Sequence, residues 1–225
     1  MDKHYHTAEW VTTQIKCACI LMASDEQDVS RFLADLGGVE DVISSVVHQE
    51  GGCSCVAHTT HGPFSNVFVS ISAVCEKYER FAEALEYATA GLETDFAKGG
   101  TTLPATRVLL QSTQGRAYAA LGRTAAAAAA LEAAATNAHR YELWLYEAFA
   151  LRDLKLLVLD QMGHGEHGSR RLGAVLRLLK GPAELLTPMM KGLDAGELMS
   201  LPAPEAECEV VYDEDPTAAA EAALR

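Results

Sequence analysis

The stretch Gly115-Arg116-Ala117-Tyr118-Ala119-Ala120-Leu121-Gly122 decides the fold, because the pattern to which it belongs occurs twice in the chain. Seven positions of 68–96 are matched 43 residues later in 111–139: Phe68, Ile71, Ser72, Cys75, Ala84, Ala88 and Phe96 correspond to Gln111, Gln114, Gly115, Tyr118, Ala127, Leu131 and His139. In both copies the spacing is that of helical faces, and small residues in the second helix let two helices pack closely. The pattern therefore predicts the same helical hairpin twice.

A third copy starts in register and then changes. Trp144, Glu147, Ala148 and Leu151 repeat the first-helix positions of the second copy, 33 residues further along the chain. The glycine-rich segment 163–168 interrupts the expected second helix, so the unit is either stretched by a loop or abandoned there. A helix is predicted over 169–180, then a weaker amphipathic stretch over 182–199, and little order from 201 onward.

This pattern resembles the tetratricopeptide repeat, a helix–turn–helix of about 34 residues. The longer spacing of 43 residues requires a loop, which 97–106 would supply with its two glycines and Pro104. The resemblance implies an all-α protein, a right-handed α-solenoid of two to four tandem repeats over 65–181, whose concave surface binds other proteins. The alternative is an irregular α-helical bundle.

The N-terminal segment 1–64 is predicted to be helical and to end in a Cys/His loop. A helix over 8–22 is followed by the capping box Ser24-Asp-Glu-Gln27 and by an apolar helical face, which the pair Gly37-Gly38 ends. Val42, Ile43, Val46 and Val47 mark a further short helix, so that 24–48 is a candidate divergent hairpin of the same array.

Composition and charge narrow the classes of function. Hydrophobic residues make up 49% of the chain and charged residues 22%, as in a soluble globular protein. The formal net charge of −13 argues against general nucleic-acid binding, which needs clustered Lys and Arg. No apolar run approaches the roughly 18 residues of a membrane helix, and no secretory segment is recognisable. We therefore expect a cytoplasmic protein without membrane or nucleic-acid partners.

The C-terminal extension 182–225 is predicted to be largely disordered and acidic. From 203 to 225 seven acids and one base give a net charge of −6, whereas seven bases and four acids give 152–191 a net charge of +3. Two interpretations stay open: the tail is solvated and aids solubility, or it folds back on the basic region as an autoinhibitory segment.

The resemblance implies a groove lined by the first helix of each repeat. Its candidate partner-binding residues are Asn66, Val69, Lys77, Arg116, Leu145, Phe149 and Arg152. Arg116 and Arg152 are expected to bind carboxylates of a peptide or helix, and their reversal to Glu to abolish capture with an unchanged helical signal. The alternative is that both arginines are solvated or pair with Glu142 or Asp153.

One specialisation of the family does not fit this chain. Members that bind the C-terminal carboxylate of a chaperone use a clamp of Lys, Asn and Arg side chains. The matching positions here are Val69, Ala73, Thr113, Glu142 and Tyr146. None carries a clamp residue, so a chaperone tail is not the expected partner.

A second hypothesis uses the loop at 53–61. Cys53, Cys55, His58 and His61 supply two thiolates and two imidazoles, the ligand types of a zinc site, in a small metal-binding or redox-responsive protein. The glycine-flanked set of His164, Glu166 and His167 is a weaker metal or proton-transfer candidate.

The chain has no phosphate-binding glycine loop, nucleophile elbow or dinucleotide fingerprint. The sequence therefore predicts a non-enzymatic adaptor or scaffold that needs no cofactor.

Overall fold

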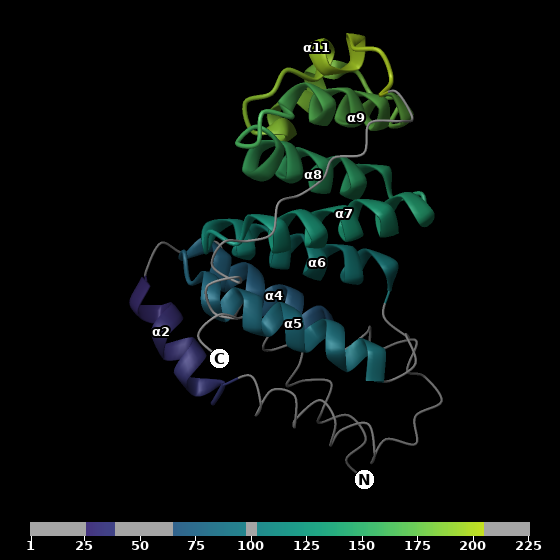
Figure 1. The fold of residues 1–225 in the computed structure, drawn as a ribbon. Helices are drawn as coiled ribbons and strands as arrows, with labels where there is room; N and C mark the ends of the chain where they lie inside the picture. Colours follow the sequence, from purple (N-terminus) through teal and green to yellow (C-terminus); the bar gives the residue numbers. More distant parts are fainter. Residues whose placement is uncertain (1–25, 39–64, 98–102, 205–225) are drawn as a thin grey trace, which may run out of the picture. The chain divides into compact units, whose positions relative to one another are not determined.

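The computed structural model describes residues 26–38, 65–97 and 103–204, and within these ranges it contains helices and no strands. The prediction of an all-α protein is confirmed for this part of the chain. The predicted helices over 8–22 and 42–47 and the Cys/His loop lie outside the described residues. The elements are α2 (Glu26–Asp35), α4 (Ser65–Lys77), α5 (Phe81–Ala97), α6 (Pro104–Ala120), α7 (Thr124–Arg140), α8 (Trp144–Leu154), the π-helical turn η1 (Lys155–Leu159), α9 (Gly165–Leu178), α10 (Ala183–Leu186), the 3-10 turn η2 (Thr187–Met190) and α11 (Ala195–Ser200) (Figure 1).

The chain divides into two compact units, and the boundary between them lies between Thr113 and Gln114, inside α6. Helices α2, α4 and α5 and the start of α6 belong to the N-terminal unit, and the elements from α7 onward to the C-terminal unit. This boundary falls within the repeat domain predicted over 65–181. No helix of the described part of the chain has the length and apolar character needed to cross a membrane.

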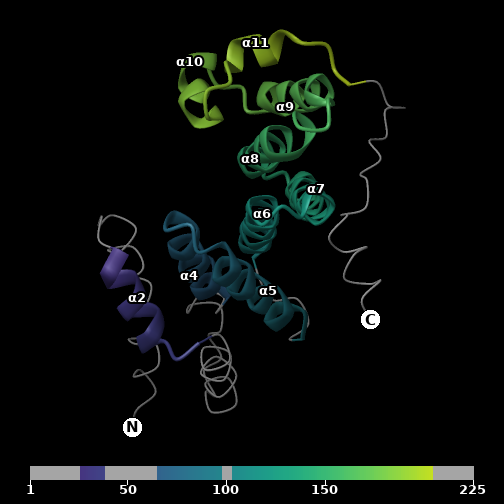
Figure 2. The ribbon, with the colours of Figure 1, turned by 60° about the vertical axis from the view of Figure 1, so that its left-hand side comes forward.

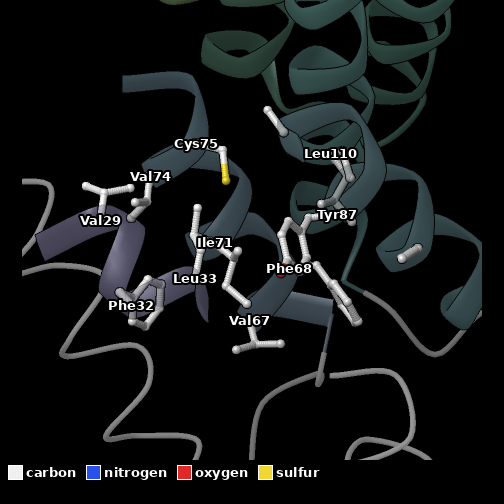
Figure 3. Packing of buried hydrophobic residues seen from close by; sticks show 13 residues of the cluster. Val29, Phe32, Leu33, Val67, Phe68, Ile71, Val74, Cys75, Tyr87 and Leu110 are labelled. Atoms are coloured by element: carbon white, nitrogen blue, oxygen red, sulfur yellow. The ribbon is translucent and has the colours of Figure 1, made fainter. Parts of the chain in front are cut away.

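The core of the N-terminal unit joins side chains from α2, α4, α5 and α6 (Figure 3). Val29, Phe32 and Leu33 of α2 are buried in it, as their spacing on one helical face predicts. Cys75 of α4, one of the matched repeat positions, is fully buried in the same cluster. At Gly91 of α5 an added Cβ would lie 2.8 Å from the Cβ of Phe68, so glycine lets these helices pack closely.

In the C-terminal unit the helices pack against neighbours that are near them in the chain. Helix α7 contacts α8, α8 contacts α9, and α9 contacts α11 (Figures 1 and 2). The alanine-rich sequence of α7 buries small side chains along one face, so that neighbouring helices approach closely. Gly115 of α6 is tightly packed, because an added Cβ would overlap the side chain of Leu131.

The same turn connects several helices. In each case a residue shortly after the helix adopts a positive φ and donates its N–H to the carbonyl of the residue three positions before it. The next residue donates its N–H to the carbonyl of the residue five positions before it. This is the Schellman motif. The carbonyl of the residue after the positive-φ residue then accepts the first hydrogen bond of the next helix, so three residues suffice to connect α4 to α5, α6 to α7 and α7 to α8. The positive-φ residues of these turns are Glu79, Gly122, Glu142 and Gly163.

The third hairpin is complete, contrary to the prediction from its glycines. Gly163, with φ 78°, is the turn residue, and α9 begins at Gly165 rather than at the predicted position 169. Gly168 lies against Leu159 and Lys155, where an added Cβ would be 3.0–3.1 Å from their side chains. The glycines therefore form a tight turn and a close helix contact instead of an interrupting loop.

Helical structure also extends beyond the predicted repeat domain. Elements α10, η2 and α11 follow α9, and Gly173 of α9 touches the backbone carbonyl of Leu198 in α11. Arg177 Nη1 donates to the carbonyl oxygens of Met199 and Leu201 at 2.8 and 2.9 Å. The amphipathic stretch predicted over 182–199 is thus largely helical, and the expectation that 182–225 is largely disordered is wrong for 183–200. Residues 205–225 lie outside the described part.

Candidate functional site

Helix α8 carries two adjacent charged residues into the C-terminal unit. Asp153 is 1% exposed and Arg152 is 9% exposed. The Nε and Nη2 atoms of Arg152 donate to Asp153 Oδ1 at 2.9 and 2.7 Å, and its Nη1 donates to the carbonyl oxygen of Met189 at 2.7 Å. Because a buried charge is costly unless it is paired and hydrogen-bonded, these contacts are what allow both groups to be buried.

Asp153 also binds two further cations. Arg116 Nη1 of α6 lies 3.2 Å from Asp153 Oδ2, and Lys191 Nζ lies 3.3 Å from Asp153 Oδ1. The side chains of Arg116 and Lys191 are 26% and 54% exposed. We call these four residues, Arg116, Arg152, Asp153 and Lys191, the Asp153 cluster. It contains three cationic groups and one carboxylate.

The partners in this cluster are regularly spaced along the chain. Arg116 and Asp153 are 37 residues apart, and so are Arg152 and Met189. In the N-terminal unit Thr113 Oγ1 lies 3.3 Å from Glu76 Oε2, again across 37 residues. Each of these three contacts therefore joins residues 37 positions apart within one unit.

An aromatic ring borders the cluster. The guanidinium carbon of Arg152 lies 5.0 Å from the centroid of the Phe149 ring, within the range of a cation–π interaction. Phe149 and Leu145, one turn earlier on α8, are both half-buried. The structure thus brings together three predicted groove residues, Arg116, Phe149 and Arg152. The sequence analysis did not identify Lys191.

The remaining predicted groove residues belong to α4 of the N-terminal unit. Asn66 lies in the first turn of this helix. Val69 packs against the core of its unit. Lys77 is exposed in the last turn, with Nζ 5.2 Å from the centroid of the Tyr78 ring.

The alternative interpretation of the two arginines, pairing with Asp153, is the one that the structure shows. Reversal of Arg152 to Glu would place two carboxylates side by side in a buried position. We therefore no longer expect the double reversal of Arg116 and Arg152 to leave the helical signal unchanged.

A second group of charges connects α7 and α8. His139 Nδ1 lies 3.1 Å from both carboxylate oxygens of Glu147, and the His139 ring meets Trp144 edge-on at 5.4 Å between centroids. Burial raises the pKa of Glu147, and the nearby His139 and Arg171 partly offset this rise in pKa. Arg171 itself forms a bidentate pair with Glu132 at 2.5 and 2.7 Å, which joins α9 to α7. These contacts hold the three helices together.

The set of His164, Glu166 and His167 is dispersed by α9. His164 precedes the first residue of the helix, and Glu166 pairs with Arg170 one turn later at 2.5 Å. Burial and the charge of Arg171 lower the pKa of His167. The predicted zinc ligands Cys53, Cys55, His58 and His61 lie outside the described residues. Among residues 26–38, 65–97 and 103–204, no three His, Cys, Asp or Glu side chains are grouped so that they could hold a metal ion.

No protein-family model, curated protein or solved structure matches this chain.

Proposed function

We propose that this chain is a non-enzymatic interaction protein, built from tetratricopeptide-like hairpins, that binds an acidic segment of a protein partner at the Asp153 cluster. The observation that carries the proposal is that one buried carboxylate positions three cationic side chains, of which Arg116 and Arg152 belong to the predicted binding face. Arg152 is engaged within the fold by all three of its nitrogen atoms. Recognition would therefore depend on the more exposed members of the cluster, Lys191 above all.

Two regularities support the repeat architecture. The turns at Glu79, Gly122 and Gly163 have the same hydrogen bonds and follow one another after 43 and 41 residues. Three contacts also join residues that are 37 positions apart: Glu76 with Thr113, Arg116 with Asp153, and Arg152 with the carbonyl of Met189. Because a helical repeat recurs at a nearly constant spacing along the chain, both regularities are what a tetratricopeptide-like array would produce.

The chemistry of the cluster favours a carboxylate-bearing partner. A cation attached to a fixed point loses less conformational freedom on binding than a mobile surface side chain. Phe149 and Leu145 offer half-buried apolar surface next to the charges, which suits a peptide that combines acidic residues with an apolar or aromatic one. The proposed partner is therefore an acidic peptide segment with one apolar anchor.

Binding to synthetic peptides tests this function. The probes are peptides that combine an acidic run with one aromatic residue, each beside a copy whose acids are replaced by their amides. The acidic peptides should bind, more weakly at high salt, and the amide copies should not. Lys191→Glu should weaken binding by about tenfold, which corresponds to one charge-assisted contact of about 1.4 kcal/mol.

Lys180→Glu is the matched control. Lys180 is exposed and has a positive φ, as Lys191 does, and the substitution changes the net charge by the same amount. It should alter the affinity less than twofold, roughly the effect of a distant screened charge. Equal losses in the two variants would show that only the overall charge of the protein matters, and the proposed site would be wrong.

The alternative function, metal binding or redox response at 53–61, stays a prediction of the sequence. Near-stoichiometric zinc in the purified chain, lost on Cys53→Ser, would support it. Metal-free protein of full stability would contradict it.

A further inference from the structure

We propose that the chain's own acidic segment 205–215 binds the Asp153 cluster and competes there with the partner. This inference rests on the proposed function, because it names an intramolecular ligand for the same surface. It follows from the charge of the segment, from the surface around Lys191 and from the place where the described chain ends.

The segment has the chemistry that the cluster would recognise. Residues 205–215 contain six acids and no Lys or Arg. Val210, Val211 and Tyr212 stand directly before Asp213-Glu214-Asp215, so an apolar and aromatic run adjoins an acidic one. This is the same combination of acidic and apolar groups that the surface of the C-terminal unit favours.

Exposed apolar side chains lie close in the chain to the exposed cation of the cluster. Leu185 of α10 is 70% exposed and Met189 of η2 is 37% exposed. Met189 is held in place because its carbonyl oxygen accepts a hydrogen bond from Arg152, and Lys191 follows two residues later. Large exposed apolar residues beside a fixed positive group suit a ligand that offers both apolar contact and carboxylates.

The described chain ends within reach of this surface. Helix α11, the last described element, contacts α10, η2 and α9 (Figure 2). Arg177 fixes the backbone immediately after α11 through the carbonyl of Leu201. From residue 205 to residue 212 an extended chain spans up to about 29 Å, and α9 is about 21 Å long. Tyr212 and the acids after it can therefore reach the cluster.

Attachment to the same chain makes even a weak contact effective. A ligand on a short linker has an effective concentration in the millimolar range, far above that of most free partners. The tail would therefore occupy the cluster in the absence of a partner, and a partner would have to displace it.

The test uses a fluorescein-labelled peptide of residues 205–215, with Cys208→Ser to prevent oxidation. Its affinity is measured by anisotropy for the full chain, for the chain that ends at Pro204, and for the full chain with Asp213→Lys, Glu214→Lys and Asp215→Lys. The truncated and the charge-reversed chains should both bind the peptide at least about tenfold more tightly than the full chain, because their own tail no longer competes. Adding Lys191→Glu to the truncated chain should abolish this gain, whereas adding Lys180→Glu should not.

Each other outcome overturns the inference in a distinguishable way. Equal affinity for the full and truncated chains would mean that the tail does not occupy the site. If the truncated chain binds unrelated acidic peptides but not 205–215, the tail proposal fails and the proposed function stands. If it binds no acidic peptide, both fail. If the molecular mass of the full chain rises with protein concentration and that of the truncated chain does not, the tail binds the cluster of a second copy of the chain instead of its own.

Discussion

Replacing Asp153 by Asn is the most informative perturbation of the C-terminal unit. The substitution keeps the size of the side chain but removes the charge that balances Arg152, which is 9% exposed. Removing one partner of a buried ion pair typically costs 3–5 kcal/mol, because the remaining charge stays desolvated. Asparagine still offers one carbonyl oxygen to the guanidinium, so we expect a loss of about 3 kcal/mol in the free energy of unfolding.

The other two cations of the cluster add little to this value. Arg116 and Lys191 are partly exposed, and ion pairs of that kind are worth about 0–1 kcal/mol. A loss of about 3 kcal/mol would lower the melting temperature by roughly 6–12 °C for a chain of this size. Arg152 is therefore the group that determines the magnitude.

Urea unfolding provides the assay. Trp144 lies on α8, and Trp10 is the other tryptophan of the chain, so a Trp10→Phe background lets fluorescence report on the C-terminal unit. The control is Glu166→Gln, since Glu166 is 75% exposed in its pair with Arg170. It should cost no more than about 0.5 kcal/mol. If Asp153→Asn costs as little as this control, the cluster does not hold α8 in place and the reasoning is refuted.

Three further predictions concern turns, packing and pH. Gly122→Ala should lower the free energy of unfolding by about 1 kcal/mol through backbone strain alone, because φ is 76° and no atom lies within 4 Å of an added Cβ. Glu142 has φ 56° in the same kind of turn, so Glu142→Gly should raise the free energy of unfolding by about as much. Urea unfolding measures both changes. Gly173→Ala should lower the free energy of unfolding by about 3 kcal/mol, because the added Cβ meets a backbone carbonyl of α11. Gly181→Ala should be nearly neutral, because its Cβ would lie 3.8 Å from the nearest atom. Similar values for the two variants would contradict this packing. Burial raises the pKa of Glu147 in the folded protein above its value in the unfolded chain. The stability that Glu147 contributes is therefore complete at a pH below its unfolded-state pKa and is lost as the pH rises through its folded-state pKa. Urea unfolding measured across this pH range should show the free energy of unfolding decline in the wild type and not in Glu147→Gln. Parallel pH profiles for the two proteins would exclude the effect.

Helix positions were largely predictable from local patterns. The apolar face of α2 and the buried positions of α4 follow directly from helical spacing, because a helix that buries one face needs apolar side chains at i, i+3, i+4 and i+7. The matched positions of 68–96 and 111–139 also anticipated the helix pairs α4–α5 and α6–α7. The repeat architecture and its binding groove stay predictions.

The glycine-rich segment shows where local reasoning failed. The sequence of 163–168 indicated an interruption, since glycine weakens a helix by about 1 kcal/mol. In the structure Gly168 lies close against Lys155 and Leu159, where a larger residue would not fit without a shift. Whether a glycine breaks a helix or lets it pack depends on its neighbours in space, which the sequence pattern does not identify.

The candidate site could be predicted only in part for the same reason. Arg116 and Arg152 were recognisable as cations on the first helices of two predicted repeats, but their shared partner was one of several open alternatives. Lys191 gave no signal, because it stands 38 residues from Asp153 beyond a proline-containing turn.

The sequence by itself determined that this is a helical protein, where most of its hairpins lie and that its C-terminal tail is acidic, because these properties depend on periodicity, turn residues and composition. Only the tertiary structure decided which charges are buried and paired. Burial and pairing depend on side chains that are distant in sequence, and a buried charge such as that of Arg152 is stable only where the fold brings Asp153 and the carbonyl of Met189 to it.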